Sequence, residues 1–201
     1  EAASLDFQPA TLPSPNDTTL AAALKYIAHG WTVVPVCRAA PGGGCTAAAL
    51  DAHKGDHGIG KHPTATWKTR AATTTEEAAR WWGRRTPYGP NIALLCGPSR
   101  VFALDLDGPA GEATLAAAVE VLGPLPPTLV NTTSRGRHLL FALPPSMTEA
   151  ERAALVGSGA SLRLDGRRFV SVRTGEASTG LDVRGPGGII IVAPSVHESG
   201  A

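Results

Sequence analysis

The sequence lacks an apolar run near the roughly 20 residues that a membrane-spanning helix needs, which excludes an integral membrane protein built from helices. No signal peptide is recognisable, because Asp6, Gln8 and several prolines interrupt the first residues. We therefore expect a reducing, cytoplasmic setting. The net charge is only +1, so any contact with nucleic acid has to use a local basic patch rather than a field of the whole chain.

Cysteine is scarce, and the odd number of three residues argues against a framework of disulfide bonds. The P-loop pattern GxxxxGK[ST] is missing as well, which excludes that class of nucleotide-binding enzyme. What is present is a globular balance of 43% hydrophobic and 17% charged residues in 201 positions. The 23 glycines and 17 prolines predict many turns and short elements.

The patterns predict a proline-rich extended arm over 1–15 and one domain over 16–201, built from short strands and four helices. The four helices are expected at about 16–29, 75–82, 110–122 and 148–156. Most of the strands are expected in neighbouring antiparallel pairs, each joined by a glycine-containing turn. These pairs are 91–96 with 101–106, 129–133 with 138–143, 161–164 with 168–172, and 181–185 with 189–193.

The most informative stretch is the apolar run from Val101 that ends in Asp105 and Asp107. Residues two apart on a strand point to the same face, so the two carboxylates should lie side by side. Their repulsion is relieved if a divalent cation such as Mg²⁺ lies between them, which suits phosphoryl transfer. The alternative is that Asp107 and Gly108 only begin a turn and cap the next helix.

A glycine- and alanine-rich segment at 37–63 contains few residues that can form a core but several that can bind metal. Thiolates and imidazoles are the usual ligands of a tetrahedral zinc site, although the spacing here is loose. The alternative is a loop with incidental histidines. The expected ligands are Cys37, Cys45, His57 and His62, with His53 competing for one of the last two places.

Two later stretches also bring polar groups to strand ends. Arg135, Gly136 and Arg137 form a turn before His138, and such a group can cradle an anion, or the arginines can simply be solvated. Asp182 alternates with apolar neighbours in the strand that precedes a glycine turn.

Taken together, these motifs resemble the bifunctional DNA primase/polymerase (prim-pol) domain of the archaeo-eukaryotic primase superfamily, over roughly residues 18–199. The strand ending in Asp-x-Asp resembles the first family motif, and 133–141, with its histidine, resembles the second. The stretch 181–200 resembles the long third motif, and Gly60–Pro63 with the nearby cysteines resembles a Cys/His insertion found in many members. Gly136 stands where the second motif often has serine.

The resemblance implies an α+β fold, in which an RRM-like antiparallel catalytic sheet packs against a smaller α/β unit with a Cys/His-rich insertion. It implies template-directed, two-metal nucleotidyl transfer in the replication of a plasmid, phage or mobile element. Asp105, Asp107 and Asp182 would hold Mg²⁺ or Mn²⁺, and His138 would bind the incoming triphosphate. Further nucleotide contacts would come from Arg137, Arg184, Ser195 and His197, and template contacts from Lys61, Lys68 and Arg70.

The expected partners are a single-stranded DNA template or primer-template and NTPs or dNTPs. Helicase or accessory modules are expected in a longer protein of which this chain is the catalytic part. Two other functions fit some of the residues: a non-catalytic, zinc-stapled DNA-binding module of a replication initiator, and a metal-dependent phosphohydrolase or nuclease.

Overall fold

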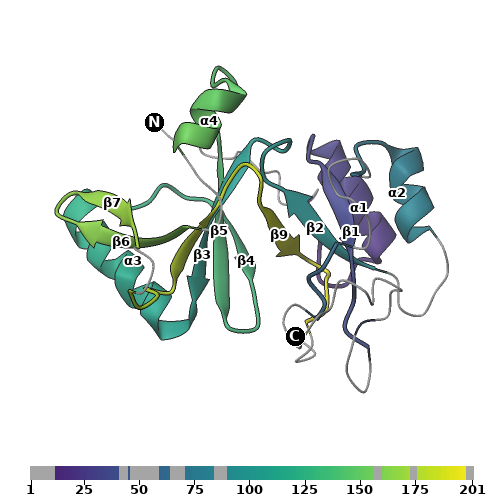
Figure 1. The fold of residues 1–201 in the computed structure, drawn as a ribbon. Coiled ribbons are helices and arrows are strands. Elements are labelled where there is room, and N and C mark those ends of the chain that lie inside the picture. The colour runs from purple at the N-terminus through teal and green to yellow at the C-terminus, as the bar shows by residue number, and fades with distance from the viewer. Residues whose placement is uncertain are drawn as a thin grey trace. The chain divides into compact units, whose positions relative to one another are not determined.

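The computed structural model describes residues 12–40, 45, 59–63, 71–83, 90–155, 160–172 and 176–197. Within them the chain has a mixed α+β fold with antiparallel strand pairs (Figure 1). The helices are α1 (Thr19–Ala28), α2 (Thr75–Trp82), α3 (Gly108–Leu122) and α4 (Glu149–Leu155). The strands are β1 (Val33–Val36), β2 (Asn91–Leu95), β3 (Val101–Asp107), β4 (Leu129–Thr132), β5 (Gly136–Ala142), β6 (Ala160–Asp165), β7 (Arg168–Ser171), β8 (Leu181–Arg184) and β9 (Ile189–Val192).

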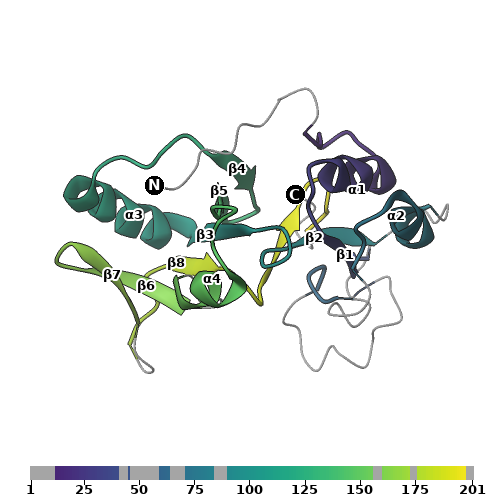
Figure 2. The same cartoon turned by 90° about the horizontal axis from the view of Figure 1, so that it is seen from above.

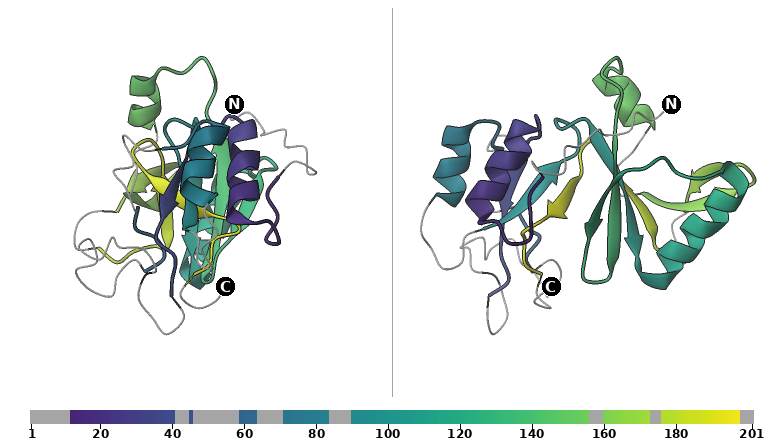
Figure 3. Two further views of the ribbon diagram at one scale, coloured as in Figure 1. Left: turned by 90° about the vertical axis from the view of Figure 1, so that its right-hand side faces the viewer. Right: turned by 180° about the vertical axis from the view of Figure 1, so that it is seen from behind.

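The chain divides into two compact units. One unit is built from Cys96–Ile189, and the other from Phe7–Leu95 together with Ile190–Ala201. The second unit contains a three-stranded sheet in the order β1-β2-β9, with α1 packed against α2 and against this sheet (Figure 3). Every residue of β1 and β2 is buried, so this sheet forms the core of its unit.

The first unit contains a six-stranded sheet in the order β4-β5-β3-β8-β6-β7. Helix α3 runs along one face of this sheet and contacts β3, β5, β6 and β8 (Figure 2). Alternate residues of the central strands point toward α3 and form an apolar cluster with Leu115 of the helix. That cluster consists of Leu104, Leu106, Leu115, Leu139, Phe141, Leu143, Leu181 and Val183. The residues between them point to the opposite face, where the polar side chains of the motifs gather.

Local signals in the sequence explain where two of the helices begin. The expected capping box is present at α2, where Thr74 and Glu77 exchange side-chain and backbone hydrogen bonds. At α1 the cap is Thr18, one residue after the expected Asn16 or Asp17. Asp17 instead accepts hydrogen bonds from the Ser14 amide and from Lys25, which fixes the turn that leads into the helix.

Two of the four expected strand pairs are confirmed and two are wrong. β4 pairs with β5, and β6 pairs with β7. The runs at 91–96 and 101–106 do not pair, because β2 lies between β1 and β9, whereas β3 lies between β5 and β8. Likewise β8 and β9 belong to different sheets. Both short turns carry the chain from one sheet to another, which the local sequence does not reveal, because a short glycine-containing turn between two strands is also typical of a hairpin.

Across the described ranges, none of the helices combines the length and the apolar character needed to cross a bilayer. Several expectations fall outside those ranges and are not addressed by the structure. They concern the arm over 1–11, the ligand candidates His53 and His57, and the template-path candidates Lys68 and Arg70.

Candidate active site

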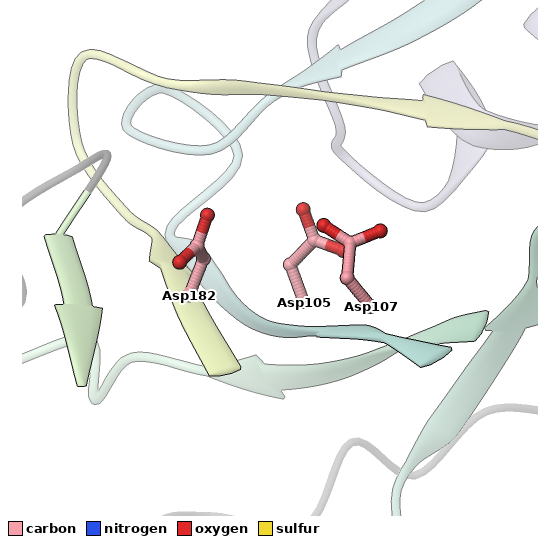
Figure 4. Close-up of side chains that lie close together, drawn as sticks. All are labelled: Asp105, Asp107 and Asp182. Carbon is pink, nitrogen blue, oxygen red and sulfur yellow. The ribbon is translucent and has the colours of Figure 1, made fainter. Parts of the chain in front are cut away.

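Strand β3 carries two acidic side chains on the face that α3 leaves open. Leu104 and Leu106 point into the apolar cluster under α3, so Asp105 and Asp107 project from the other side of the strand. Asp182 of β8 is the direct partner of Asp105 across the sheet. Figure 4 shows the three carboxylates on the same side of their strands. One ligand oxygen from each lies within 4.8 Å of the others.

Asp105 is the centre of a row of polar residues that are in register across five neighbouring strands. The row consists of Asn131 on β4, His138 on β5, Asp105 on β3, Asp182 on β8 and Ser161 on β6. Neighbouring side chains in it interact. Asn131 Nδ2 lies 3.0 Å from His138 Nδ1, and His138 Nε2 lies 3.3 Å from Asp105 Oδ1. At the other end the Ser161 hydroxyl donates a hydrogen bond to Asp182 Oδ1.

Arg184 joins the two acids in the middle of the row. Its Nε and Nη2 donate to Asp105 Oδ2 at 3.1 and 3.0 Å, and the same Nη2 lies 3.3 Å from Asp182 Oδ2. Arg184 and Asp182 are two residues apart on β8, so they share a face. The register partner of Arg184 on β3 is Ala103, whose small side chain leaves space for the guanidinium above β3.

The environment of Asp105 favours its charged form. Burial alone raises the pKa of this carboxyl group, since its side chain is only 13% exposed. The His138 ring and the Arg184 guanidinium outweigh burial and hold the pKa below its ordinary value. Asp105 is therefore a carboxylate at neutral pH, as a metal ligand has to be.

Asp107 occupies the N-cap position of α3, but its carboxylate caps none of the helix amide groups. It is half-exposed, and Arg135 Nη2 lies 3.8 Å from its Oδ1. The capping role considered for Asp107 therefore does not use its side chain, which stays available beside Asp105. The three clustered carboxylates form a set of oxygen ligands that suits Mg²⁺ or Mn²⁺. The guanidinium of Arg184 is a cation that lies between two of them, Asp105 and Asp182.

The surroundings of Gly136 explain why this chain has glycine where the second motif often has serine. A Cβ atom at this position would lie 1.8 Å from the backbone oxygen of Leu106. Gly136 pairs with Asp107 in the sheet, and its amide donates to the Thr133 hydroxyl. Any side chain here would push β5 away from β3, at the point where the first two motifs meet.

The structure does not place Arg137 with the other candidates. Residues 137 and 138 are neighbours on β5, so their side chains point to opposite faces of the sheet. Arg137 instead forms a bidentate ion pair with Glu112 of α3, with both N–O distances at 2.8 Å.

Ser195 and His197 belong to the other unit, and their expected contact with nucleotide stays a prediction. The Ser195 hydroxyl donates to the Ile92 carbonyl and accepts a hydrogen bond from the Ile92 amide. Asn91, which is buried, accepts from the Val196 amide and donates to the carbonyls of Val196 and Gly60. These bonds anchor the end of the third motif, and the segment around Gly60, to β2.

Two of the four expected zinc ligands lie together. The Cys45 thiol donates to Cys37 Sγ at 2.7 Å, and the Gly60 amide donates to Cys45 Sγ at 3.4 Å. The backbone of His62 lies beside Cys37, since its carbonyl oxygen accepts a hydrogen bond from the Cys37 amide. In the residues that the structure describes, the only group of three or more metal-ligating side chains is the acidic one on the sheet. The zinc site therefore stays a prediction.

Asn131 and Ser161 are the site residues that the sequence reasoning missed. Each lies at the end of the polar row and contacts a side chain of a motif, His138 or Asp182. A signal existed for Asn131, because it alternates with the hydrophobic Val130 in a strand whose partner carries His138. Ser161 had no such signal, since its place depends on the pairing of β6 with β8.

One comparison with known proteins finds a family. The model of the family described as "Bifunctional DNA primase/polymerase, N-terminal" matches residues 23–201, which is most of the chain. No curated protein and no solved structure matches the chain.

Proposed function

Because this chain belongs to the bifunctional DNA primase/polymerase family, we propose that it is a template-directed nucleotidyltransferase that synthesises or extends primers on DNA. The observation that supports this most is the position of Asp182. A third carboxylate arrives from a distant part of the chain, within 4.8 Å of the Asp-x-Asp pair. Three acids at this spacing can hold divalent metals, which phosphoryl transfer uses in pairs.

The residues of the row have distinct roles in this proposal. Asp105, Asp107 and Asp182 hold the metals, Mg²⁺ or Mn²⁺. When bound, such ions activate the primer 3′-hydroxyl and neutralise charge on the leaving pyrophosphate. His138 presents its Nε2 edge to the acidic site, where an N–H can donate to a phosphate oxygen of the incoming nucleotide. Arg184 supplies further donors to the same phosphates.

The remaining expectations complete the proposal. The six-stranded sheet serves as the RRM-like catalytic sheet of the family. Ser195 and His197 contact the nucleotide, Lys61, Lys68 and Arg70 contribute to the template path, and the segment 37–63 binds zinc. The partners are a DNA template or primer-template, NTPs or dNTPs, and the helicase or accessory modules of a longer replication protein of a plasmid, phage or mobile element. The cytoplasmic location also stays a prediction.

A primer-extension assay separates this function from the two alternatives. The protein is incubated with end-labelled primer-template, dNTPs and Mn²⁺, and the products are resolved on a denaturing gel. We expect longer products from the wild type and none from Asp105→Ala, while both bind DNA. Shortened primer would indicate a nuclease instead. Binding without any product from the wild type would indicate a non-catalytic DNA-binding module.

A further inference from the structure

Arg184 contacts the same carboxylate oxygens that a metal ion would use. Its Nη2 is shared between Oδ2 of Asp105, at 3.0 Å, and Oδ2 of Asp182, at 3.3 Å. These acids lie on different strands and face each other in register, so their charges would repel if nothing lay between them. The guanidinium is a cation held between two metal ligands.

The contacts of Arg184 are also shielded from water. Its side chain is 33% exposed, and those of Asp105 and Asp182 are 13% and 21% exposed. Ion pairs with so little exposure are screened less than surface pairs. By contrast, Arg135 approaches Asp107 only to 3.8 Å, and its side chain is 71% exposed. Of these two arginines, only Arg184 bridges two acids.

We propose that Arg184 is a positioning residue that substitutes for the metal in the metal-free protein, and that a divalent ion has to displace its guanidinium in order to bind. This inference rests on the proposed metal-dependent function. Two cations so close to each other repel strongly in a partly buried site, so the guanidinium and the ion cannot share the same Oδ2 atoms. The displaced guanidinium, with its five N–H donors, is then available beside the site.

The exchange has two consequences. Without metal, Arg184 keeps Asp105 and Asp182 in the geometry that the metal needs, although their charges repel. With metal, the interaction energy of Arg184 with the acids is lost, so the observed metal affinity is lower than the three carboxylates alone would give.

The first measurement is the affinity for Mn²⁺ of protein that was stripped of metal with EDTA, without nucleotide or DNA. The concentration of free Mn²⁺ is read from its electron paramagnetic resonance signal. We expect Arg184→Gln to bind Mn²⁺ about tenfold more tightly than the wild type, the fold-change that corresponds to about 1.4 kcal/mol. The matched control is Arg135→Gln, which removes the same charge near the same cluster but no bridge, and its affinity should change less than about twofold. An equal gain in the control, or unchanged or weaker binding by Arg184→Gln, would overturn the inference.

The second measurement follows the guanidinium itself. In ¹H–¹⁵N spectra of the arginine Nε–H groups, the Arg184 signal is identified by its loss in Arg184→Gln. We expect this hydrogen to exchange slowly in the metal-free protein and at least about tenfold faster when Mg²⁺ is added, because its carboxylate acceptor is taken. A signal that is unaffected by saturating Mg²⁺ would contradict displacement. Neither measurement depends on polymerisation, so failure of the inference and failure of the proposed function are distinguishable.

Discussion

Asp182 on β8 lies directly opposite Asp105 on β3, and both carboxylates project from the same face of the sheet. This pairing joins the first and third motifs into one site. Had Asp182 been one residue out of register, its side chain would have pointed toward α3 and the apolar cluster. The register of β8 on β3 is therefore the feature of the fold on which the proposed chemistry depends.

The first prediction concerns Asn131 and the tautomer of His138. We expect the Asn131 amide to donate to His138 Nδ1, which places the ring hydrogen on Nε2, facing Asp105. Asn131→Ala removes this donor, so the hydrogen is no longer held on Nε2 and the donor that faces the nucleotide is weakened. We expect the KM for nucleotide to rise about tenfold, with a smaller change in kcat.

The ring nitrogens of His138 report this change independently of activity, through ¹⁵N chemical shifts compared with those of His138→Gln. Asn131→Asp is the contrasting variant, because a carboxylate then accepts at each ring nitrogen and the Nε2 donor is kept, so its KM should rise less. If Asn131→Ala keeps the hydrogen on Nε2, the role given to Asn131 is wrong.

The second prediction concerns Gly136. Restoring the serine common in the family, by Gly136→Ser, forces a Cβ against the Leu106 carbonyl. We expect a loss of about 1–3 kcal/mol in the free energy of unfolding, as for other overpacked sites. Urea denaturation measures it, and Gly97→Ala is the control, because a Cβ at Gly97 meets only ordinary contacts. Equal stability of the two variants would show that β5 adapts to the side chain.

The site shows what the sequence could and could not predict. The shared face of Asp105 and Asp107 followed from the period of a strand, which is a local property. The same period places Arg137 and His138 on opposite faces, so the pairing of Arg137 with Glu112 could have been anticipated in part. The place of Asp182 was expected only through the family resemblance, because the pairing of β8 with β3 is non-local.

The two wrong hairpins have the same physical origin. A short glycine-containing turn between two apolar runs is typical of a hairpin, yet β2 and β3 separate into different sheets. The sheet to which a strand belongs is decided by the strand whose edge it hydrogen-bonds to, and a turn does not encode this when the partner is distant in sequence. By contrast, the pairs β4–β5 and β6–β7 join strands that are neighbours in sequence, and both were predicted correctly.

The third prediction concerns zinc. Burial, together with the hydrogen bond from Cys45, raises the pKa of Cys37 to about 11, so this thiol stays protonated unless a metal binds. We expect protein purified without chelators to contain about one zinc per chain by mass spectrometry of the metal. Cys37→Ser and Cys45→Ser should lose it, while Cys96→Ser keeps it. If the wild-type protein contains no zinc, the prediction is wrong and the two thiols form only a structural contact.

The fourth prediction concerns alkaline pH. Burial raises the pKa of Cys96 to about 12, with Arg184 lowering it slightly. Because the folded pKa lies above the unfolded value of about 8.5, the stabilisation is complete below that value and is lost as the pH rises toward the folded pKa. Between pH 7.5 and 10 the unfolding free energy of the wild type should fall by about 1–2 kcal/mol more than that of Cys96→Ala. The unfolding free energies are measured by urea titration at each pH. An equal loss in the wild type and in Cys96→Ala would contradict this assignment.

The fifth prediction tests the central claim, that Asp182 completes one site with the Asp-x-Asp pair. The measurement is the rate of single-nucleotide addition to a primer-template by wild type, Asp105→Asn, Asp182→Asn and the control Asp165→Asn, which changes an exposed carboxylate in the same unit. We predict that both site variants lose at least about a hundredfold in rate, while Asp165→Asn stays within about twofold of wild type. Addition by Asp182→Asn at the wild-type rate would contradict the account.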